Sequence, residues 1–484
     1  MKTKKNCFSF YFIPIIIALL SITSCTKEDP IPVPGSTLIL DINTFIWEGL
    51  NYNYLWYKDL YNLSDNRFTG DAERDAYLIN FNDPEALFYY LLNDYPNVDE
   101  FSWITEDYVE LNKYFQGITT SMGYKYILIP HAGIGLVGSV LYVVDGSPAD
   151  KAGIKRGDIF SQVNGTDITS SNYGYLLYNV DSYTLTISEL VSYMPKPLRT
   201  VHLSAEEVVE NPVHYSNIYN IGDKKVGYLF YKGFRNNYEV ELNNVFGYFA
   251  SEGIDELVLD LRYNGGGYVS TCARLGSMIY QADTNKIFCI KEYNDKLGQW
   301  LIDEYGPDAQ NFNFYYSLYQ EDNSIIPINS LGLDHIYVLA TGSSASASEL
   351  LINCLRAYID VTIIGSKTYG KNVGSITVYD EDDEGNINPD HLWAMQPIIS
   401  MSYDVNHQSP YANGFQADYS VYEDYLNIIP FGDENETMLK YALDLISGNP
   451  PKGLLLNKPV FDIVFDSEEE YQFRNVMITD LERK

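Results

Sequence analysis

Cysteine and histidine are both scarce in this chain of 484 residues. The five cysteines, at positions 7, 25, 272, 289 and 354, have neither the C-x-x-C spacing of zinc sites nor the pattern of a disulfide framework. The six histidines lie in no recognisable motif, so a Ser/His/Asp triad has no visible candidate. We therefore expect no metal site and no organic cofactor.

Positive charge is also short, with 32 Lys and Arg against 65 Asp and Glu, a formal net charge of -33. A field of that sign repels phosphate backbones, so we expect no nucleic-acid partner. Acidity alone identifies no substrate, because it also keeps an ordinary surface soluble. The 46% hydrophobic and 20% charged residues are typical of a globular protein, and the length predicts two or three domains.

The apolar run near the N-terminus, from about Phe8 to Leu20, is too short to span a bilayer. It follows three lysines, as the h-region of a signal peptide does. Ser-Ile-Thr-Ser before Cys25 resembles the lipobox of bacterial lipoproteins, with Ile22 where leucine is usual. We predict that residues 1–25 are a lipoprotein signal peptide and lipobox, and that Cys25 carries a lipid anchor.

The next three residues after Thr26, Lys27-Glu28-Asp29, resemble the acidic export tag of Bacteroidetes surface lipoproteins. The expected location is therefore the cell envelope, as an outer-membrane lipoprotein on the periplasmic or the surface face. Contact with the membrane is expected through the lipid anchor only.

Patterning divides the rest of the chain into five parts. Residues 26–38 hold three prolines and a glycine and read as a linker. Helical spacing predicts a helical domain over 39–122, and short alternating strands with glycine turns predict a β-rich module over 123–209. Strands alternate with helices over 210–450, and 451–484 form a tail. The fold class is multidomain α/β.

A run of small residues, Thr341 to Leu350, lies between the strand-like segment His335 to Ala340 and an apolar-faced helical segment. A serine in such a turn is held in the open, while the first N–H groups of the helix point toward developing negative charge. Ser346 is the candidate nucleophile. The same run also fits a Ser/Thr-rich helix cap packed by alanines, which is the commoner case.

Lys371 ends a second turn, Thr368 to Lys371, which follows the apolar strand Val361 to Gly365. This order would bring the lysine beside the start of the helix after Ser346. To act as a general base, its amine must be neutral, so its pKa must fall from roughly 10.4 by about three units, or about 4 kcal/mol. Only burial can supply that shift. A surface lysine after a turn is the commoner alternative.

A third strand, Leu257 to Leu261, runs into the glycine-rich turn Asn264 to Gly267. Glycines there let backbone N–H groups approach a substrate closely, which suits an oxyanion hole. A phosphate cradle is the rival interpretation. No Gly-Lys-Ser/Thr follows these glycines, and the net charge disfavours polyphosphate.

These three segments together resemble the C-terminal processing, or tail-specific, peptidases of family S41. The match comprises Ser-Ala-Ser-Ala-Ser-Glu, a lysine 25 residues after its middle serine, and Asp-Leu-Arg-x-Asn-x-Gly-Gly, all in family order. The resemblance implies an α/β, crotonase-like catalytic domain. It implies Ser346 as nucleophile, Lys371 as base, and the N–H of Ala347 with that of Gly266 or Gly267 as oxyanion hole.

One position departs from the family pattern. Many members carry glutamine four residues after the lysine as an orienting third residue, and this chain has Ser375 there. A hydroxyl can still bond the lysine amine, but it reaches less far. Ser375, or a residue from elsewhere, is therefore expected to orient Lys371. The segment Gly414 to Asp418 resembles the later Gly-Ile-x-Pro-Asp of the family.

The β-rich module has its own resemblance. Gly146 to Ile159, followed by Val163-Asn-Gly165, resembles the signature of PDZ domains. Residues 133–138 also satisfy G-x-G-x-x-G, but a strand rather than a helix follows, so a dinucleotide site is not expected. The resemblance implies that a peptide C-terminus binds at four residues: Gly133, Ile134, Gly135 and Leu136.

The function that this resemblance implies is that of a serine endopeptidase. A Ser/Lys dyad would cleave protein or peptide substrates, and the PDZ domain would recognise their accessible C-termini. The alternative, from another class, is a non-catalytic peptide- or ligand-binding surface lipoprotein on the same fold.

Overall fold

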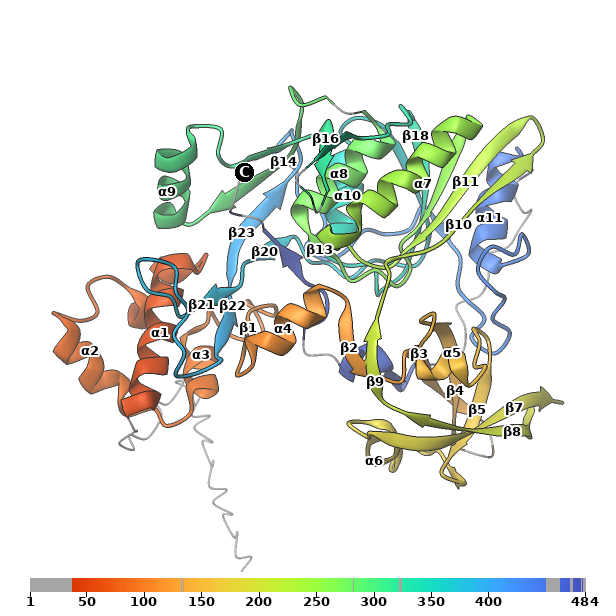
Figure 1. The fold of residues 1–484 in the computed structure, drawn as a ribbon, viewed down its shortest axis with the longest axis horizontal. Coiled ribbons are helices and arrows are strands. Elements are labelled where there is room, and N and C mark those ends of the chain that lie inside the picture. The colour runs from red at the N-terminus through yellow and green to blue at the C-terminus, as the bar shows by residue number, and fades with distance from the viewer. Residues whose placement is uncertain are drawn as a thin grey trace, which may run out of the picture.

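The computed structural model describes residues 37–131, 133, 135–281, 283–320, 322, 324–449, 462–470, 473–479 and 481. The predicted signal peptide with Cys25, almost all of the linker, and Ile134 of the predicted peptide-binding loop lie outside these residues. Within them the chain is a mixed helix and sheet protein. As predicted, it has an N-terminal helical region, a β-rich module and an α/β domain (Figure 1).

An apolar stripe on the first helix holds the N-terminal region together. Ile42, Phe45, Ile46 and Leu50 recur at helical spacing and are buried. Two later helices begin at aspartates whose carboxylates accept hydrogen bonds from first-turn N–H groups. The elements are α1 (Thr37–Asn53), 3₁₀ turns Tyr57–Asp59 and Tyr61–Leu63, α2 (Asp71–Leu78), α3 (Pro84–Leu91), β1 (Trp103–Thr105), α4 (Tyr108–Phe115) and β2 (Ile118–Ser121).

The short strands predicted in the β-rich module are present. They lie in one antiparallel sheet of order β25-β3-β4-β5-β7-β8. The edge strand β25 comes from the C-terminal tail, with Phe465 opposite Leu128 of β3. The elements are β3 (Tyr124–His131), β4 (Gly135–Val143), α5 (Pro148–Lys151), β5 (Ile159–Val163), β6 (Thr166–Asp167), α6 (Tyr173–Leu177), β7 (Ser182–Val191), β8 (Met194–Ser204) and β25 (Phe465–Asp466).

The α/β domain is built on a six-stranded sheet of order β10-β11-β12-β18-β19-β24, parallel from β11 onward. The three predicted turns follow β12, β18 and β19, so they meet at the carboxyl edge of this sheet, where α/β folds bind ligands. The elements are β9 (Glu206–Val209), β10 (Val213–Ile221), β11 (Lys224–Tyr231), a 3₁₀ turn (Asn236–Tyr238), α7 (Glu239–Glu252), β12 (Glu256–Asp260), α8 (Val269–Ile279), β18 (His335–Ala340), α10 (Ala347–Leu355), β19 (Asp360–Gly365), β24 (Tyr419–Ser420) and α11 (Thr437–Ile446).

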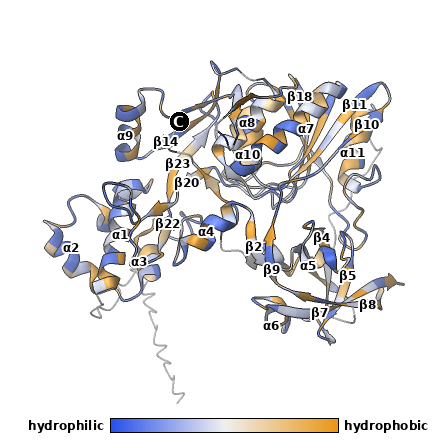
Figure 2. Ribbon diagram, in the orientation of Figure 1, coloured by the Kyte–Doolittle hydropathy of each residue, from blue (hydrophilic) through white to orange (hydrophobic). Residues whose placement is uncertain are grey.

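Helices cover both faces of this sheet (Figure 1). The buried side chains of α7, α8 and α10 form one core with one face of the strands. The helix α11 packs on the other face, in a second core that also takes in apolar side chains of β3 and β4. The β-rich module is therefore joined to the α/β domain through a shared core. Figure 2 shows α7, α8 and α10 each with both hydrophobic and hydrophilic colours, as expected of helices with one buried face.

A second six-stranded sheet, which the sequence did not predict, lies beside the turns. Its order is β13-β26-β20-β23-β14-β15, and β26 comes from the C-terminal tail. Several of its strands have only two or three residues, too few to show an alternating pattern. The remaining elements are β13 (Gly267–Tyr268), β14 (Ile287–Tyr293), α9 (Asp295–Tyr305), β15 (Asn311–Asn313), β16 (Ser317–Tyr319), β17 (Ile325–Pro327), β20 (Val373–Ser375), β21 (Val378–Tyr379), β22 (Ala394–Gln396), β23 (Ile398–Tyr403), a 3₁₀ turn (Ser467–Glu470) and β26 (Met477–Ile478).

The N-terminal helical region rests on this second part of the α/β domain. Its core includes Val373, Met395 and Ile398, which belong to β20, β22 and β23. Among the helices of the described residues, none is long and apolar enough to cross a membrane.

Candidate active site

Ser346 lies in the turn between β18 and α10, as predicted. Its backbone has φ of 61° and ψ of -114°, a conformation that costs a non-glycine residue on the order of 1–3 kcal/mol. Its side chain is 0% exposed, and its Oγ has no hydrogen-bond partner among the described residues. The hydroxyl is thus held at a helix N-terminus without a structural hydrogen bond of its own.

Asn264 ties the glycine turn to the serine turn. Its carbonyl oxygen accepts hydrogen bonds from Ala345 N at 3.1 Å and Ser348 Oγ at 2.9 Å, on either side of the candidate nucleophile. Its own side chain donates to Tyr231 O at 3.0 Å and accepts from Gly266 N at 2.9 Å. The backbone carbonyl of Asn264 therefore joins the glycine turn to the serine turn, and its buried side chain holds the glycine turn itself in place.

Glu349 joins the serine turn to the lysine turn. Its carboxylate accepts hydrogen bonds from Ser346 N at 3.0 Å, Lys371 N at 2.9 Å, Gly370 N at 2.8 Å and Thr368 Oγ1 at 2.6 Å. Burial raises the pKa of Glu349, and these four donors oppose that rise. The backbone N–H groups of the two predicted catalytic residues thereby meet at one oxygen, Oε2, of this carboxylate.

Lys371 is buried, with 2% of the residue exposed. Burial lowers its pKa to about 7, Asp99 opposes that fall, and the charge of Lys291 adds to it. Its Nζ donates a hydrogen bond to Asn475 O at 2.9 Å and lies 4.8 Å from the centre of the Phe101 ring. The lowered pKa that a lysine base requires is therefore present, and burial is its main cause.

The two glycines predicted for the oxyanion hole differ in their hydrogen bonds. Gly266 N donates to Asn264 Oδ1, whereas Gly267 N donates to Val476 O at 2.7 Å. Ala347 is the first residue of α10, so its N–H has no acceptor within the helix. Both glycine N–H groups are thus already hydrogen-bonded, and of the two glycines it is Gly266 that lies against the serine, because an added Cβ there would be 2.8 Å from Ser346 Oγ.

Ser375 does not take the role of the missing glutamine. Its hydroxyl donates to Met477 O at 3.3 Å and accepts from Gln396 Nε2 at 3.1 Å. Within the described part of the chain, no hydrogen bond joins Ser375 to Lys371. The lysine amine is held instead by Asn475 O, a backbone oxygen 104 residues away in sequence. A backbone oxygen leaves no signal in the side-chain pattern, so sequence reasoning could not find it.

A buried ionic network lies at the start of the glycine turn. The guanidinium of Arg262 bonds Asp260, Glu423 and Glu436, and all four residues are buried. Arg156 of the β-rich module reaches the same network through Glu423 at 2.8 Å. Although burial acts in the other direction, the two guanidinium groups lower the pKa of Glu423 to about 2. The Asp-Leu-Arg motif thus has a structural role, because its arginine joins three buried carboxylates directly before the turn.

Of the described residues predicted to bind a peptide carboxylate, Gly133 lies between β3 and β4, and Gly135 and Leu136 begin β4. Gly133 and Gly135 have positive φ, and Leu136 N donates to Ile168 O at 2.8 Å. The turn between the two strands is at the far end of β3 from its first residue, Tyr124. The outer edge of β3 carries β25 of the same chain.

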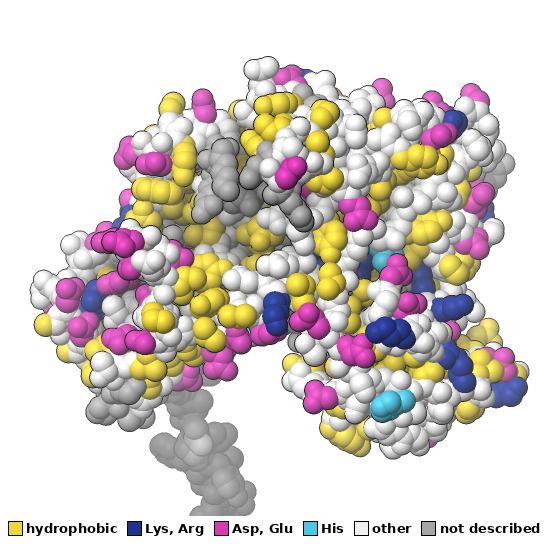
Figure 3. Space-filling view, in the orientation of Figure 1, with side chains coloured by type: hydrophobic (Ala, Val, Ile, Leu, Met, Phe, Trp, Pro, Cys, Tyr) yellow, Lys and Arg dark blue, Asp and Glu magenta, His cyan; other side chains and the backbone are white. Residues whose placement is uncertain are grey.

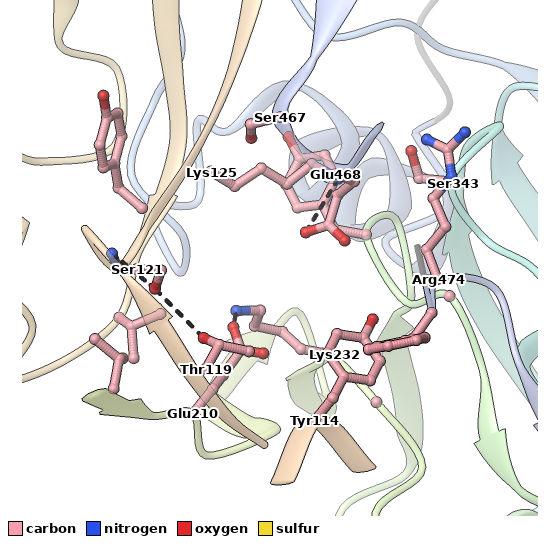
Figure 4. Close-up of a pocket in the computed structure, with 18 of the residues that line it drawn as sticks. Tyr114, Thr119, Ser121, Lys125, Glu210, Lys232, Ser343, Ser467, Glu468 and Arg474 are labelled. Carbon is pink, nitrogen blue, oxygen red and sulfur yellow. Dashed lines mark hydrogen bonds and ion pairs between the residues drawn. The ribbon is translucent and has the colours of Figure 1, made fainter. Parts of the chain in front are cut away.

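A cavity of about 670 Å³ lies where the β-rich module meets the α/β domain. In Figure 4, Lys125 and Glu468 lie on one side of it and Glu210 and Lys232 on the other. Figure 3 shows Lys and Arg side chains gathered around this junction, while Asp and Glu are spread over the rest of the visible face. Asn475, Val476 and the glycine turn line the cavity, whereas Ser346 and Lys371 do not.

The fold and the site together define a class of protein. Its members have an α/β domain joined to a β-rich module. At one edge of the α/β sheet lie a serine in a strand-to-helix turn, a buried lysine of lowered pKa and a glycine turn. The profile of peptidase family S41 matches residues 225–421, that of the peptidase S41 N-terminal domain matches 41–103, and that of the PDZ domain matches 139–177. The chain belongs to peptidase family S41, and its β-rich module is a PDZ domain.

Three similar proteins support this assignment. A C-terminal processing peptidase of the Tetradesmus obliquus chloroplast is 27% identical over 56% of this chain and 55% of its own. A CtpA-like serine protease of Staphylococcus aureus strain COL is 26% identical over 48% of this chain and 41% of its own. The chain thus spans about half the length of these curated relatives. A crystal structure from Bacteroides fragilis NCTC 9343, assigned to the S41 proteases, covers 88% of this chain and 100% of its own, with 28% identity and a TM-score of 0.66.

Proposed function

We propose that this protein is a serine endopeptidase that uses a Ser346 and Lys371 dyad. The observation that carries the proposal is the buried lysine, whose pKa falls to about 7 and whose backbone shares the Glu349 carboxylate with Ser346. An amine with that pKa is largely neutral slightly above neutral pH, so it can accept a proton.

The proposed reaction gives each of these residues a role. Lys371 Nζ takes the Ser346 proton as Oγ bonds to the substrate carbonyl carbon, and the N–H group of Ala347, with that of Gly266 or Gly267, stabilises the oxyanion. When the C–N bond breaks, Lys371 gives that proton to the leaving amine. Lys371 then takes a proton from water, which attacks the ester. Collapse of that second oxyanion breaks the bond to Oγ, and the proton returns to Ser346.

The proposed substrates are unfolded or partly folded proteins with accessible C-termini. PDZ domains bind peptides by adding them as a strand to a sheet edge, and the outer edge of β3, which β25 of the same chain occupies in this structure, lies beside the cavity. The cavity leads from that edge to the glycine turn. A C-terminus held on the PDZ domain would therefore place the preceding residues near the dyad.

We also propose that the chain is tethered to the outer membrane through a lipid on Cys25. The support is the lipobox-like sequence before that residue, and two or three acyl chains are enough for stable anchoring. Replacement of this residue, Cys25→Ala, should release the chain from the membrane fraction. Unchanged partitioning would contradict the anchor.

The test of the dyad is turnover of an unstructured protein with a hydrophobic C-terminus. We expect Ser346→Ala and Lys371→Ala each to abolish cleavage, and the exposed neighbour variant Lys367→Ala to retain it. Cleavage that survives both dyad substitutions would contradict the proposal. Saturable binding of peptide C-termini without any cleavage by the unaltered chain would favour the non-catalytic alternative.

A further inference from the structure

The C-terminal segment, defined here as the described residues 462–470 and 473–479, runs from the PDZ domain to the active site. Its first part forms β25 on the outer edge of β3. Its second part forms β26 and contacts Lys371 and Gly267. One stretch of the chain therefore contacts both places where a substrate is expected.

At the PDZ end, the C-terminal segment is bound as an added strand. Val464 N donates to Leu128 O at 2.9 Å, and Tyr126 N donates to Ser467 Oγ at 2.9 Å. Phe465 is 6% exposed, and its ring lies 5.3 Å from that of Tyr173 in α6. This is the way in which extended peptides bind sheet edges, with backbone bonds for affinity and a side-chain pocket for specificity.

Charge complementarity holds the middle of the C-terminal segment. Lys125 Nζ lies 3.4 Å from Asp466 Oδ1 and 3.7 Å from Glu468 Oε1, and the Tyr142 hydroxyl donates to Glu468. Burial opposes it, but the positive charges of Lys125 and Lys232 lower the pKa of Glu468. Acidic residues of the C-terminal segment thus pair with the buried Lys125, while Lys232 faces them from the other side of the cavity, where it pairs with Glu210 (Figure 4).

At the active site, the backbone of the C-terminal segment takes up the groups that a substrate needs. Asn475 O accepts the hydrogen bond of the Lys371 amine, and Val476 O accepts that of Gly267 N at 2.7 Å. The strand β26 then continues parallel to β13 and β20. Val476, Met477 and Ile478 are buried there, and Ser346 itself is 0% exposed.

We infer that the C-terminal segment is an internal ligand of the substrate path, and that the resting chain is latent until a polypeptide displaces it. The contacts define the chemical class of that polypeptide. It is an extended chain with an aromatic side chain at the β3 edge, an acidic pair beside Lys125, and aliphatic residues at the glycine turn. That the displacing polypeptide is a substrate rests on the proposed function. That the C-terminal segment occupies the path does not.

Binding in trans tests this inference without any need for turnover. The probe is a labelled peptide with the sequence of residues 462–479, added to the full chain carrying Ser346→Ala. Two more substitutions, Phe465→Ser and Val476→Ser, remove buried apolar contacts of the C-terminal segment. The matched control is Ile463→Ser, because that residue lies on the same segment but is 45% exposed.

We expect the peptide to bind the doubly substituted chain at least tenfold more tightly than the Ser346→Ala chain or the control, because the internal competitor is weakened. Equal affinity in all three folded chains would overturn the inference. Thermal unfolding establishes that each chain is folded.

A second measurement uses the Ser346→Ala chain with its C-terminal segment unchanged. Saturating peptide should increase hydrogen exchange at the amides of residues 473–479 at least tenfold, and unchanged exchange would also overturn the inference. In the catalytically intact background, the doubly substituted chain should cleave an unstructured protein at least tenfold faster. If no chain cleaves while the peptide still binds as expected, the proposed function fails and the internal ligand stands.

Discussion

The surroundings of Ser346 and those of Lys371 are built in different ways. The serine turn is positioned by Asn264 and Glu349, which belong to the same sequence motifs as the catalytic candidates. The lysine amine lies beside Phe101 of the N-terminal helical region and Asn475 of the C-terminal segment, and neither residue belongs to a motif. The nucleophile is therefore encoded locally, whereas the basicity of the lysine depends on how distant segments pack.

The largest expected effect concerns the turns around Ser346, which the local sequence encodes. Gly267 has φ of 135°, and an added Cβ would lie 2.2 Å from Phe234 O. We expect Gly267→Ala to lower the free energy of unfolding by about 3 kcal/mol or more and to abolish activity. Calorimetry should separate it from Gly222→Ala, where φ is 65° and no atom lies within 4 Å. That control should cost only about 1 kcal/mol, and equal losses would contradict the account.

The next prediction separates stability from activity at the lysine. Between about pH 7 and the ordinary lysine pKa, the unfolded chain binds a proton on Lys371 that the folded chain does not. The stability of the wild type should therefore rise with pH across that range. Lys371→Met removes the group and should raise the free energy of unfolding by about 3 kcal/mol at pH 7.

The gain in stability of Lys371→Met should shrink as the pH approaches 10. This variant should be inactive at every pH. Denaturant unfolding at several pH values measures the gain in stability. The exposed control Lys367→Met should show no such pH dependence. A stability gain that did not vary with pH would count against a buried, neutral lysine.

A third substitution, at Glu349, tests both regions at once, because this carboxylate accepts hydrogen bonds from the serine turn and from the lysine turn. In Glu349→Gln, one acceptor oxygen becomes an amide that faces backbone donors. We expect a loss of about 2–3 kcal/mol in stability and a fall in activity on the order of 10²-fold. The exposed control Glu384→Gln should change stability by less than about 0.5 kcal/mol. Normal activity in the Glu349 variant would show that the shared carboxylate is dispensable.

The smallest effect concerns the tuning of the lysine by a distant charge. Asp99 raises the pKa of Lys371, so its removal should lower that pKa further. In Asp99→Asn, the acid limb of the kcat/KM profile should move to lower pH. A pH series of kcat/KM measures the shift, and movement to higher pH would contradict the assigned direction.

The sequence predicted those parts of the molecule that short-range pattern controls. The strands and helices around Ser346 follow from alternation and helical spacing, and the PDZ and S41 motifs lie where they were expected. The second sheet was missed because strands such as β13 and β26 have only two residues each. Ser375 was a reasonable candidate from spacing, yet the lysine amine bonds a backbone oxygen of the tail, which no pattern of side chains could reveal.

The measurement that tests the dyad most directly is the rate at which a fluorophosphonate phosphonylates Ser346, with loss of fluoride, as a function of pH. A base with a pKa of about 7 must be neutral to act, so the rate should rise with pH to a plateau with its midpoint near that value. Lys371→Ala should abolish the pH-dependent labelling. A midpoint near the ordinary pKa of lysine, or equal labelling of the Lys371→Ala chain, would contradict the Ser346 and Lys371 dyad.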